Sequence, residues 1–143
     1  MIPKESAPNL ELFATALARF QAALAQPKTE WMRDAAIQRF EFTIELAWKT
    51  VMRFARREGV DCSSPRQALR AAFKLGWIGD EDIWFDMLED RNRTSHMYNE
   101  MLAEELYARL PGYQSALSAL LERLRQLAEP PKAEDEQSPP LEQ

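Results

Sequence analysis

The only histidine of the chain, His96, lies in a polar segment that also holds two arginines and a tyrosine. The segment runs Asp90-Arg91-Asn92-Arg93-Thr94-Ser95-His96-Met97-Tyr98-Asn99. An imidazole titrates near neutral pH and can move a proton to or from a ribose 2′-hydroxyl or a leaving oxygen, while a guanidinium binds phosphate. These residue types suit metal-free cleavage of a phosphodiester. A lone histidine is also commonly a structural residue at the surface or at a helix cap, and this alternative stays open.

The spacing within this segment limits which side chains can meet. In an ideal α-helix, Arg91 and His96 differ by about 140° in direction and about 7.5 Å in rise, so they do not share a face. Asn92 and His96 are one turn apart, so we expect Asn92 to hydrogen-bond the imidazole and fix its tautomer. To reach the same point, Arg91 would need its long side chain, a helix end near Thr94 to Ser95, or a second subunit.

Two groups of basic residues could hold the rest of an RNA strand. One is an i, i+4, i+8 stripe of Arg66, Arg70 and Lys74, and the other gathers near residue 57, in Lys49, Arg53, Arg56 and Arg57. Cations near a helix C-terminus also suit the helix dipole, and we weight the two explanations equally.

Other common catalytic and metal-binding patterns are absent from the sequence. It contains no glycine-rich phosphate loop, no Gly-x-Ser-x-Gly elbow and no His-Glu-x-x-His. The single cysteine, Cys62, cannot form an internal disulfide, and only His96 could join it at a zinc site. We therefore expect no metal site and no cofactor.

Helices must position these residues, because apolar side chains recur at three- and four-residue steps almost everywhere. The sequence predicts an all-α bundle, and each of the five expected starts carries a capping residue, with Asn9 at the first and Pro65 at the first helical position of the third helix. The expected helices run from Asn9 to Pro27, from Thr29 to Gly59, from Ser64 to Gly76, from Asp80 through Leu88, and from Asn99 to Leu127. Pro111 removes an amide donor, so we expect a kink or a break there.

The second of these helices carries two apolar stripes. One consists of Ile37, Phe40, Ile44, Ala47, Val51 and Phe54, and the other of Trp31, Ala35, Phe42 and Leu46. Two stripes indicate either a helix in the middle of the bundle or a second stripe that meets another copy of the chain. Glu41, Glu45 and Lys49 lie between the stripes, where a surface ion pair is the default expectation.

The net charge of −5 is concentrated in the last fifteen residues, which are rich in proline and glutamate. Residues 129–143 carry −4, which leaves about −1 for residues 1–128. We expect one helical domain over 1–128 and a disordered acidic tail over 129–143. Since no long apolar run and no signal-peptide pattern is present, we also expect a cytoplasmic protein without membrane contact.

Two segments of the chain resemble a known family. They are Ile37-Gln38-Arg39-Phe40-Glu41-Phe42-Thr43-Ile44-Glu45-Leu46-Ala47-Trp48-Lys49-Thr50 and the run from Arg91 to Glu100. Arg91, Asn92, His96 and Tyr98 form an R-x-x-x-x-H-x-Y pattern that resembles the HEPN signature, and both segments are similar to nucleotidyltransferase substrate-binding proteins. The resemblance covers about residues 9–127. It implies an up-and-down bundle of four main helices and a short one, like the C-terminal domain of kanamycin nucleotidyltransferase, and a homodimer.

The resemblance implies two possible functions. In HEPN ribonuclease toxins of toxin–antitoxin pairs, Arg91 and His96 would be catalytic on RNA and Asn92 supporting. Tyr98 would then be the hydroxyl that a cognate minimal nucleotidyltransferase, the antitoxin, adenylylates to silence the toxin. Arg93 adds a charge that could substitute for Arg91 or compete with it. Other members of the family are non-catalytic substrate-binding subunits of a nucleotidyltransferase, and a purely structural helical adaptor is a third alternative.

Overall fold

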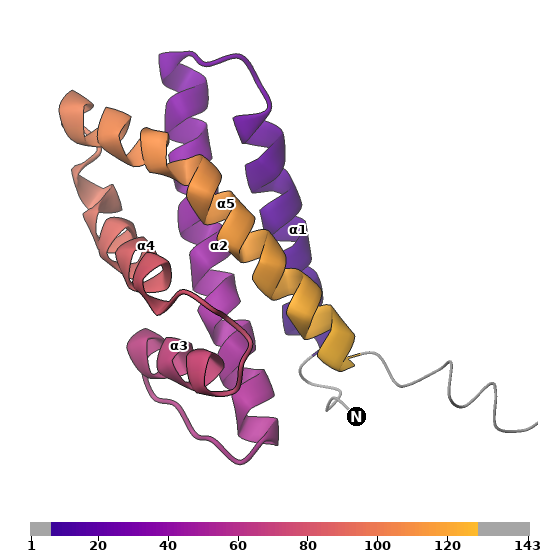
Figure 1. Ribbon diagram of the computed structural model, residues 1–143. Helices are drawn as coiled ribbons and strands as arrows, with labels where there is room; N and C mark the ends of the chain where they lie inside the picture. The colour runs from indigo at the N-terminus through magenta and orange to yellow at the C-terminus, as the bar shows by residue number, and fades with distance from the viewer. Residues whose placement is uncertain (1–6, 129–143) are drawn as a thin grey trace, which may run out of the picture.

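The computed structural model describes residues 7–128, which form helices only. The helices are α1 (Ala7–Leu24), α2 (Glu30–Arg57), α3 (Pro65–Lys74), α4 (Glu81–Arg93), the short 3-10 helix η2 (Thr94–His96) and α5 (Glu100–Ala128). Figure 1 shows α1, α2, α4 and α5 alternating in direction, with the short α3 across one end of the bundle. The predicted all-α bundle of four main helices and a short one is confirmed. The tail predicted over 129–143 lies outside the described residues.

Four predicted helix starts are confirmed by their capping bonds. The side-chain oxygens of Thr29, Ser64 and Asp80 accept from backbone N–H groups two or three residues on, at 3.0–3.1 Å. The Asn99 side chain accepts from the backbone of Leu102 at 3.1 Å. Only the first start was wrong: α1 begins at Ala7 rather than after Asn9. Pro8 lies in the first turn, where a helix needs no N–H donor.

Of the kink or break expected at Pro111, the break is absent, because α5 is one helix from Glu100 to Ala128. Leu106, Leu110, Tyr113 and Leu117 are all buried on one side of it, both before and after the proline. Burial of this continuous apolar face stabilises the helix by more than the loss of one backbone hydrogen bond destabilises it. Figure 1 shows α5 changing direction along its length rather than stopping.

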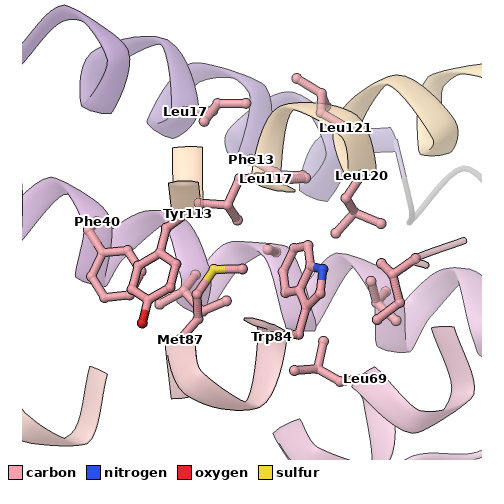
Figure 2. Close-up of a cluster of buried hydrophobic side chains, with 14 of the residues drawn as sticks. Phe13, Leu17, Phe40, Leu69, Trp84, Met87, Tyr113, Leu117, Leu120 and Leu121 are labelled. Atoms are coloured by element: carbon pink, nitrogen blue, oxygen red, sulfur yellow. The ribbon is translucent and has the colours of Figure 1, made fainter. Parts of the chain in front are cut away.

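The core lies where α1, α2, α4 and α5 face one another (Figure 2). Phe40 of α2 stacks on Tyr113 of α5 with ring centroids 5.3 Å apart. All six residues of the first apolar stripe of α2 are buried, as predicted. The second stripe is only partly covered: Ala35 and Leu46 are half-buried, whereas Trp31 is 83% exposed and Phe42 49%. A central place in the bundle therefore does not account for Trp31 and Phe42.

One carboxylate, Asp90 near the end of α4, is buried among hydrogen-bond donors of α5. It is 2% exposed and accepts from the Tyr113 hydroxyl at 2.6 Å and from Arg109 Nε at 2.7 Å. Arg93 Nη1 donates to it at 2.9 Å. Burial opposes its ionisation, but the bonds from Arg109 and Tyr113 prevail and hold the pKa of Asp90 below its usual value. Asp90 thereby joins the last turn of α4 to α5.

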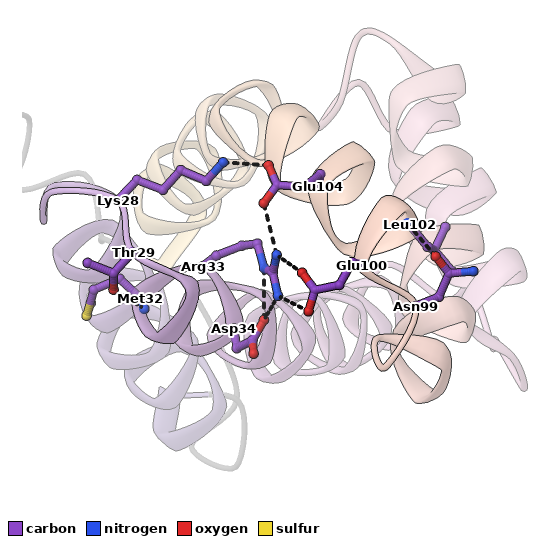
Figure 3. Close-up of polar contacts among 9 residues, drawn as sticks. All are labelled: Lys28, Thr29, Met32, Arg33, Asp34, Asn99, Glu100, Leu102 and Glu104. Atoms are coloured by element: carbon purple, nitrogen blue, oxygen red, sulfur yellow. Dashed lines mark hydrogen bonds and ion pairs between the residues drawn. The ribbon is translucent and has the colours of Figure 1, made fainter.

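A buried arginine, Arg33 of α2, makes the matching connection at the start of α5 (Figure 3). It is 2% exposed, and its Nη1 lies 2.7 Å from Glu100 Oε1 and 2.9 Å from Glu104 Oε2. Asp34 and Lys28 extend this network by pairing with Arg33 and Glu104. The residues between α4 and α5 are thus held between two polar clusters, one around Asp90 and one around Arg33.

Replacing Asp90 by alanine should destabilise the protein by about 3 kcal/mol, since three charge-assisted bonds are lost and the buried Tyr113 hydroxyl loses its acceptor. Because the folded pKa of Asp90 is lowered, its charge-dependent contribution is fully present above the ordinary value of 3.8 and is lost as the pH falls below it. Urea unfolding at neutral and acidic pH measures both effects.

Asp86→Ala is the matched control, because Asp86 is an exposed carboxylate on the same helix. Its free energy of unfolding should stay within about 0.5 kcal/mol of the wild type. Equal losses in the two variants would contradict the assigned role of Asp90.

Candidate functional site

Arg91 occupies the last turn of α4 and points toward α2. Its Nε donates to Glu45 Oε1 at 3.0 Å, and its Nη1 lies 3.7 Å from Glu41 Oε2. The predicted pair of Glu45 with Lys49 is present at the longer distance of 3.8 Å. Sequence reasoning missed that Arg91 is the nearer partner, because the partner comes from another helix. The Arg91 side chain is 35% exposed, so its guanidinium is held in place yet reachable from solvent.

Arg93 points the other way. Its guanidinium contacts Asp90 at 2.9 Å and Glu89 at 3.9 Å. Residues three and four apart share a helix face, so Arg93 follows Asp90 and Glu89 while Arg91 does not. The two arginines therefore lie on different sides of α4, and only Arg91 faces α2.

His96 is exposed on the short helix that follows α4. The α-helix ends at Arg93, and the Thr94 hydroxyl donates to the Arg91 carbonyl at 2.7 Å, so the helix end near Thr94, one of the three alternatives for Arg91, is present. The predicted hydrogen bond from Asn92 to the His96 imidazole is wrong: no hydrogen bond joins these two residues within residues 7–128. The helical i to i+4 geometry on which that bond depended stops between them.

Tyr98 completes the exposed turn. Its side chain is 83% exposed, and its ring lies edge-on to the His96 ring with centroids 6.0 Å apart. The His96 carbonyl accepts from the backbone N–H of Asn99 at 3.0 Å, which closes the turn before α5. No residue of this described turn has a positive φ angle. A hydroxyl and an imidazole thus stand side by side on an open surface.

A groove adjoins Arg91 where α2, α3 and α4 meet. Arg91 and Asn92 line one side of it, with Leu88 from the same helix. The remaining lining residues come from α2 and from the start of α3 and are Glu45, Trp48, Ser64, Pro65 and Arg66. Trp48 and the Arg66 end of the basic stripe were not assigned to the site from the sequence. The one available signal was that Glu45 and Trp48 are three residues apart and so share a helix face.

The basic residues predicted to bind RNA are distributed between this groove and other surfaces. The Arg66 and Arg70 guanidiniums lie over the Phe85 ring, 4.7 and 5.6 Å from its centroid. Arg56 lies 3.9 Å from Asp61, close to the C-terminal end of α2. Only Arg66 of these residues reaches the groove beside Arg91.

Two further observations concern metals and membranes. Over residues 7–128, no three His, Cys, Asp or Glu side chains gather as a metal ion would require. Within the same range, none of the helices combines the length and the apolar character needed to cross a bilayer.

Two solved structures share this fold. One is a protein of Thermus thermophilus, with a TM-score of 0.76 and 37% identity over 79% of this chain and 98% of that chain. The other is a Haemophilus influenzae protein, with a TM-score of 0.75 and 28% identity over 81% of this chain and 98% of that chain. The latter structure is described as revealing the fold of a substrate-binding domain of a nucleotidyltransferase. The bundle is therefore of the nucleotidyltransferase substrate-binding class.

Residues 8–126 match the family model described as nucleotidyltransferase substrate binding protein like, and the chain belongs to this family. The resemblance seen in the sequence is confirmed. The chain is also 35% identical over 96 residues to a curated protein of Haemophilus influenzae (strain ATCC 51907 / DSM 11121 / KW20 / Rd) named Probable ribonuclease HepT. That match covers 64% of this chain and 66% of the relative, just under two thirds of the relative's length.

Replacing Arg91 by alanine should leave the fold intact. The ion pair with Glu45 is about one-third exposed, so solvent screens it, and we expect its loss to change the free energy of unfolding by less than about 1 kcal/mol. Urea unfolding of Arg91→Ala beside Asp90→Ala measures the contrast. A loss as large as that of Asp90→Ala would show that Arg91 is needed for folding.

Proposed function

We propose that this protein is the HEPN component of a two-gene toxin–antitoxin module. It is a metal-independent endoribonuclease that acts as a homodimer in the cytoplasm and is neutralised by a cognate minimal nucleotidyltransferase. The observation that carries the proposal is that the reachable Arg91 guanidinium, bonded to Glu45, stands one short turn before the exposed His96. The likeness to a protein named Probable ribonuclease HepT supports it.

In this function the RNA 2′-hydroxyl attacks the adjacent phosphorus, and the 5′-oxygen of the next nucleotide leaves. The His96 imidazole takes the proton from the 2′-hydroxyl and passes it to the leaving 5′-oxygen. Arg91 stabilises the charge that develops on the phosphate oxygens. The products are a 2′,3′-cyclic phosphate and a free 5′-hydroxyl, so no water and no cofactor is consumed in the step.

Arg91 rather than Arg93 is the arginine of this step, because Arg93 is already bonded to the buried Asp90 on the other side of α4. Arg93 and Asn92 then have supporting roles: Arg93 holds the end of α4, and Asn92 lines the groove beside Arg91. Glu45 is a positioning residue, since its carboxylate fixes the direction of the Arg91 side chain.

The homodimer supplies the second half of the site. Arg91 faces α2 while His96 stands on the exposed turn, so pairing across two copies brings an arginine of one to a histidine of the other. The partly covered second stripe of α2, with the exposed Trp31 and Phe42, is an apolar surface suited to such an association.

Tyr98 is the control point. The partner transfers AMP from ATP to the Tyr98 oxygen, with loss of pyrophosphate, and the exposed hydroxyl is open to such a transfer. The added phosphate stands beside the His96 ring and competes with RNA for Arg91. Silencing thus follows from charge and bulk at the place where RNA must bind.

A second candidate function is a non-catalytic subunit that presents substrate to a nucleotidyltransferase. The structural relative described as a nucleotidyltransferase substrate-binding domain favours it. This function requires ligand binding in the groove beside Arg91 and no RNA cleavage, so a cleavage assay separates the two.

His96→Ala and Arg91→Ala should each reduce RNA cleavage at least 100-fold, because one removes the proton-transfer group and the other the phosphate contact. Cleavage of a fluorescently labelled RNA in the presence of EDTA measures the loss. Arg123→Ala is the matched control, an exposed arginine on α5 bonded only to Gln126 among the described residues, and it should retain full activity. Undiminished cleavage by either site variant would refute the catalytic assignment.

Incubation with the cognate nucleotidyltransferase of the proposed pair and ATP should add the mass of one or more AMP units and abolish cleavage. Tyr98→Phe should not be modified, because the accepting oxygen is gone, and it should stay active with the partner present. Tyr107→Phe is the control, since Tyr107 is partly buried on α5 under Lys28. An AMP adduct that persists in Tyr98→Phe would place the modification elsewhere.

A further inference from the structure

The groove beside Arg91 combines a flat aromatic surface with two guanidiniums. The indole of Trp48 is half-buried at this groove, next to the apolar side chains of Leu88 and Pro65. Arg91 lines the groove from α4, and Arg66 lines it from the start of α3. Glu45 already holds Arg91 in place, so neither the Trp48 side chain nor Arg66 is needed to position it.

The charges of the groove leave one cation without a counter-ion. Glu45 is the only carboxylate among the lining residues, and it is bonded to Arg91 and lies 3.8 Å from Lys49. Arg66 forms no ion pair with any residue between 7 and 128, and its guanidinium rests on the Phe85 ring. Arg66 is therefore free to bind an anion that enters the groove.

An unpaired nucleotide has the chemistry that fits this arrangement. Its base has an apolar π-face that stacks on aromatic side chains, and its flanking phosphates bind guanidiniums in a bidentate manner. A base inside a double helix is already stacked on its neighbours and cannot reach an indole in a groove. A groove with this chemistry would favour single-stranded over double-stranded RNA.

We propose that the groove between α2, α3 and α4 is a nucleobase subsite, in which Trp48 stacks on an unpaired base and Arg66 binds a phosphate next to it. The subsite rests on the proposed ribonuclease function in one respect: Arg91 then holds the scissile phosphate at the edge of the same groove. It restricts the substrate to RNA whose target nucleotide is unpaired, in a loop or a single strand. Stacking of a base on Trp48 then selects the position at which the RNA is cleaved.

The test measures binding of a fluorescently labelled 2′-O-methyl oligoribonucleotide, which cannot form the cyclic phosphate and so is not cleaved. The wild type should bind the single strand more tightly than its duplex. Trp48→Leu should weaken single-strand binding about tenfold or more, since the stacking surface is lost, and Trp48→Phe should restore most of the affinity. Arg66→Ala should weaken binding and lower its dependence on salt concentration by about one phosphate contact.

Phe73→Leu is the matched control, because Phe73 is an exposed aromatic residue of α3 that does not line the groove, and it should bind as the wild type does. Thermal unfolding by circular dichroism establishes that each variant is folded. Single-strand affinity that is unchanged in a folded Trp48→Leu would overturn the subsite, and so would equal affinity for the duplex. Absence of any binding to the wild type would also overturn it and assign the groove to a protein partner.

The result is independent of whether RNA is cut. Trp48-dependent binding together with intact ordinary RNA would retain the subsite and refute the ribonuclease proposal. Cleavage of ordinary RNA with the same site preference in Trp48→Leu as in the wild type would retain the ribonuclease proposal and refute the subsite.

Discussion

The buried carboxylate of Asp90 determines how α4 is rotated against the rest of the bundle. Three donors from α4 and α5 converge on it, and leaving such a charge buried without them would be costly. Once Asp90 faces α5, the helical rotation of about 100° per residue turns its neighbour Arg91 toward α2. The acidic pair Glu41 and Glu45 then receives Arg91. A structural contact one residue away thus decides which arginine faces α2 and which stays with Asp90.

The second buried charge, Arg33, fixes the far end of the segment that connects α4 to α5. By binding Glu100 and Glu104 in the first turns of α5, it fixes where that helix starts. The residues from Thr94 to Asn99 must therefore span a fixed distance between two anchored helices. This explains how His96 and Tyr98 can be exposed and still have defined positions, which is a requirement for groups that act on a substrate.

Local signals made most of the fold predictable from sequence. Thr29, Ser64, Asp80 and Asn99 were identified as caps because capping depends on residues three apart, and the all-α class followed from apolar spacing. The continuity of α5 through Pro111 was not predictable, since it depends on burial against other helices. In the site, His96 stood out as the only histidine, whereas the contact between Arg91 and Glu45 joins residues 46 positions apart, which spacing does not reveal. The expected bond from Asn92 to His96 is absent because it required the helix to continue to His96, whereas the helix ends at Arg93.

The turn from Thr94 to Asn99 uses only backbone conformations that every L-amino acid adopts readily, since none of its φ angles is positive. No glycine or proline is present there, and the side chains that bond to the backbone are those at its two ends, Thr94 and Asn99. Substitution within it therefore carries little conformational cost, so the surface chemistry of this position can diverge while the bundle stays the same. One scaffold can in this way carry different side-chain chemistry at this turn without any change in the packing of its helices.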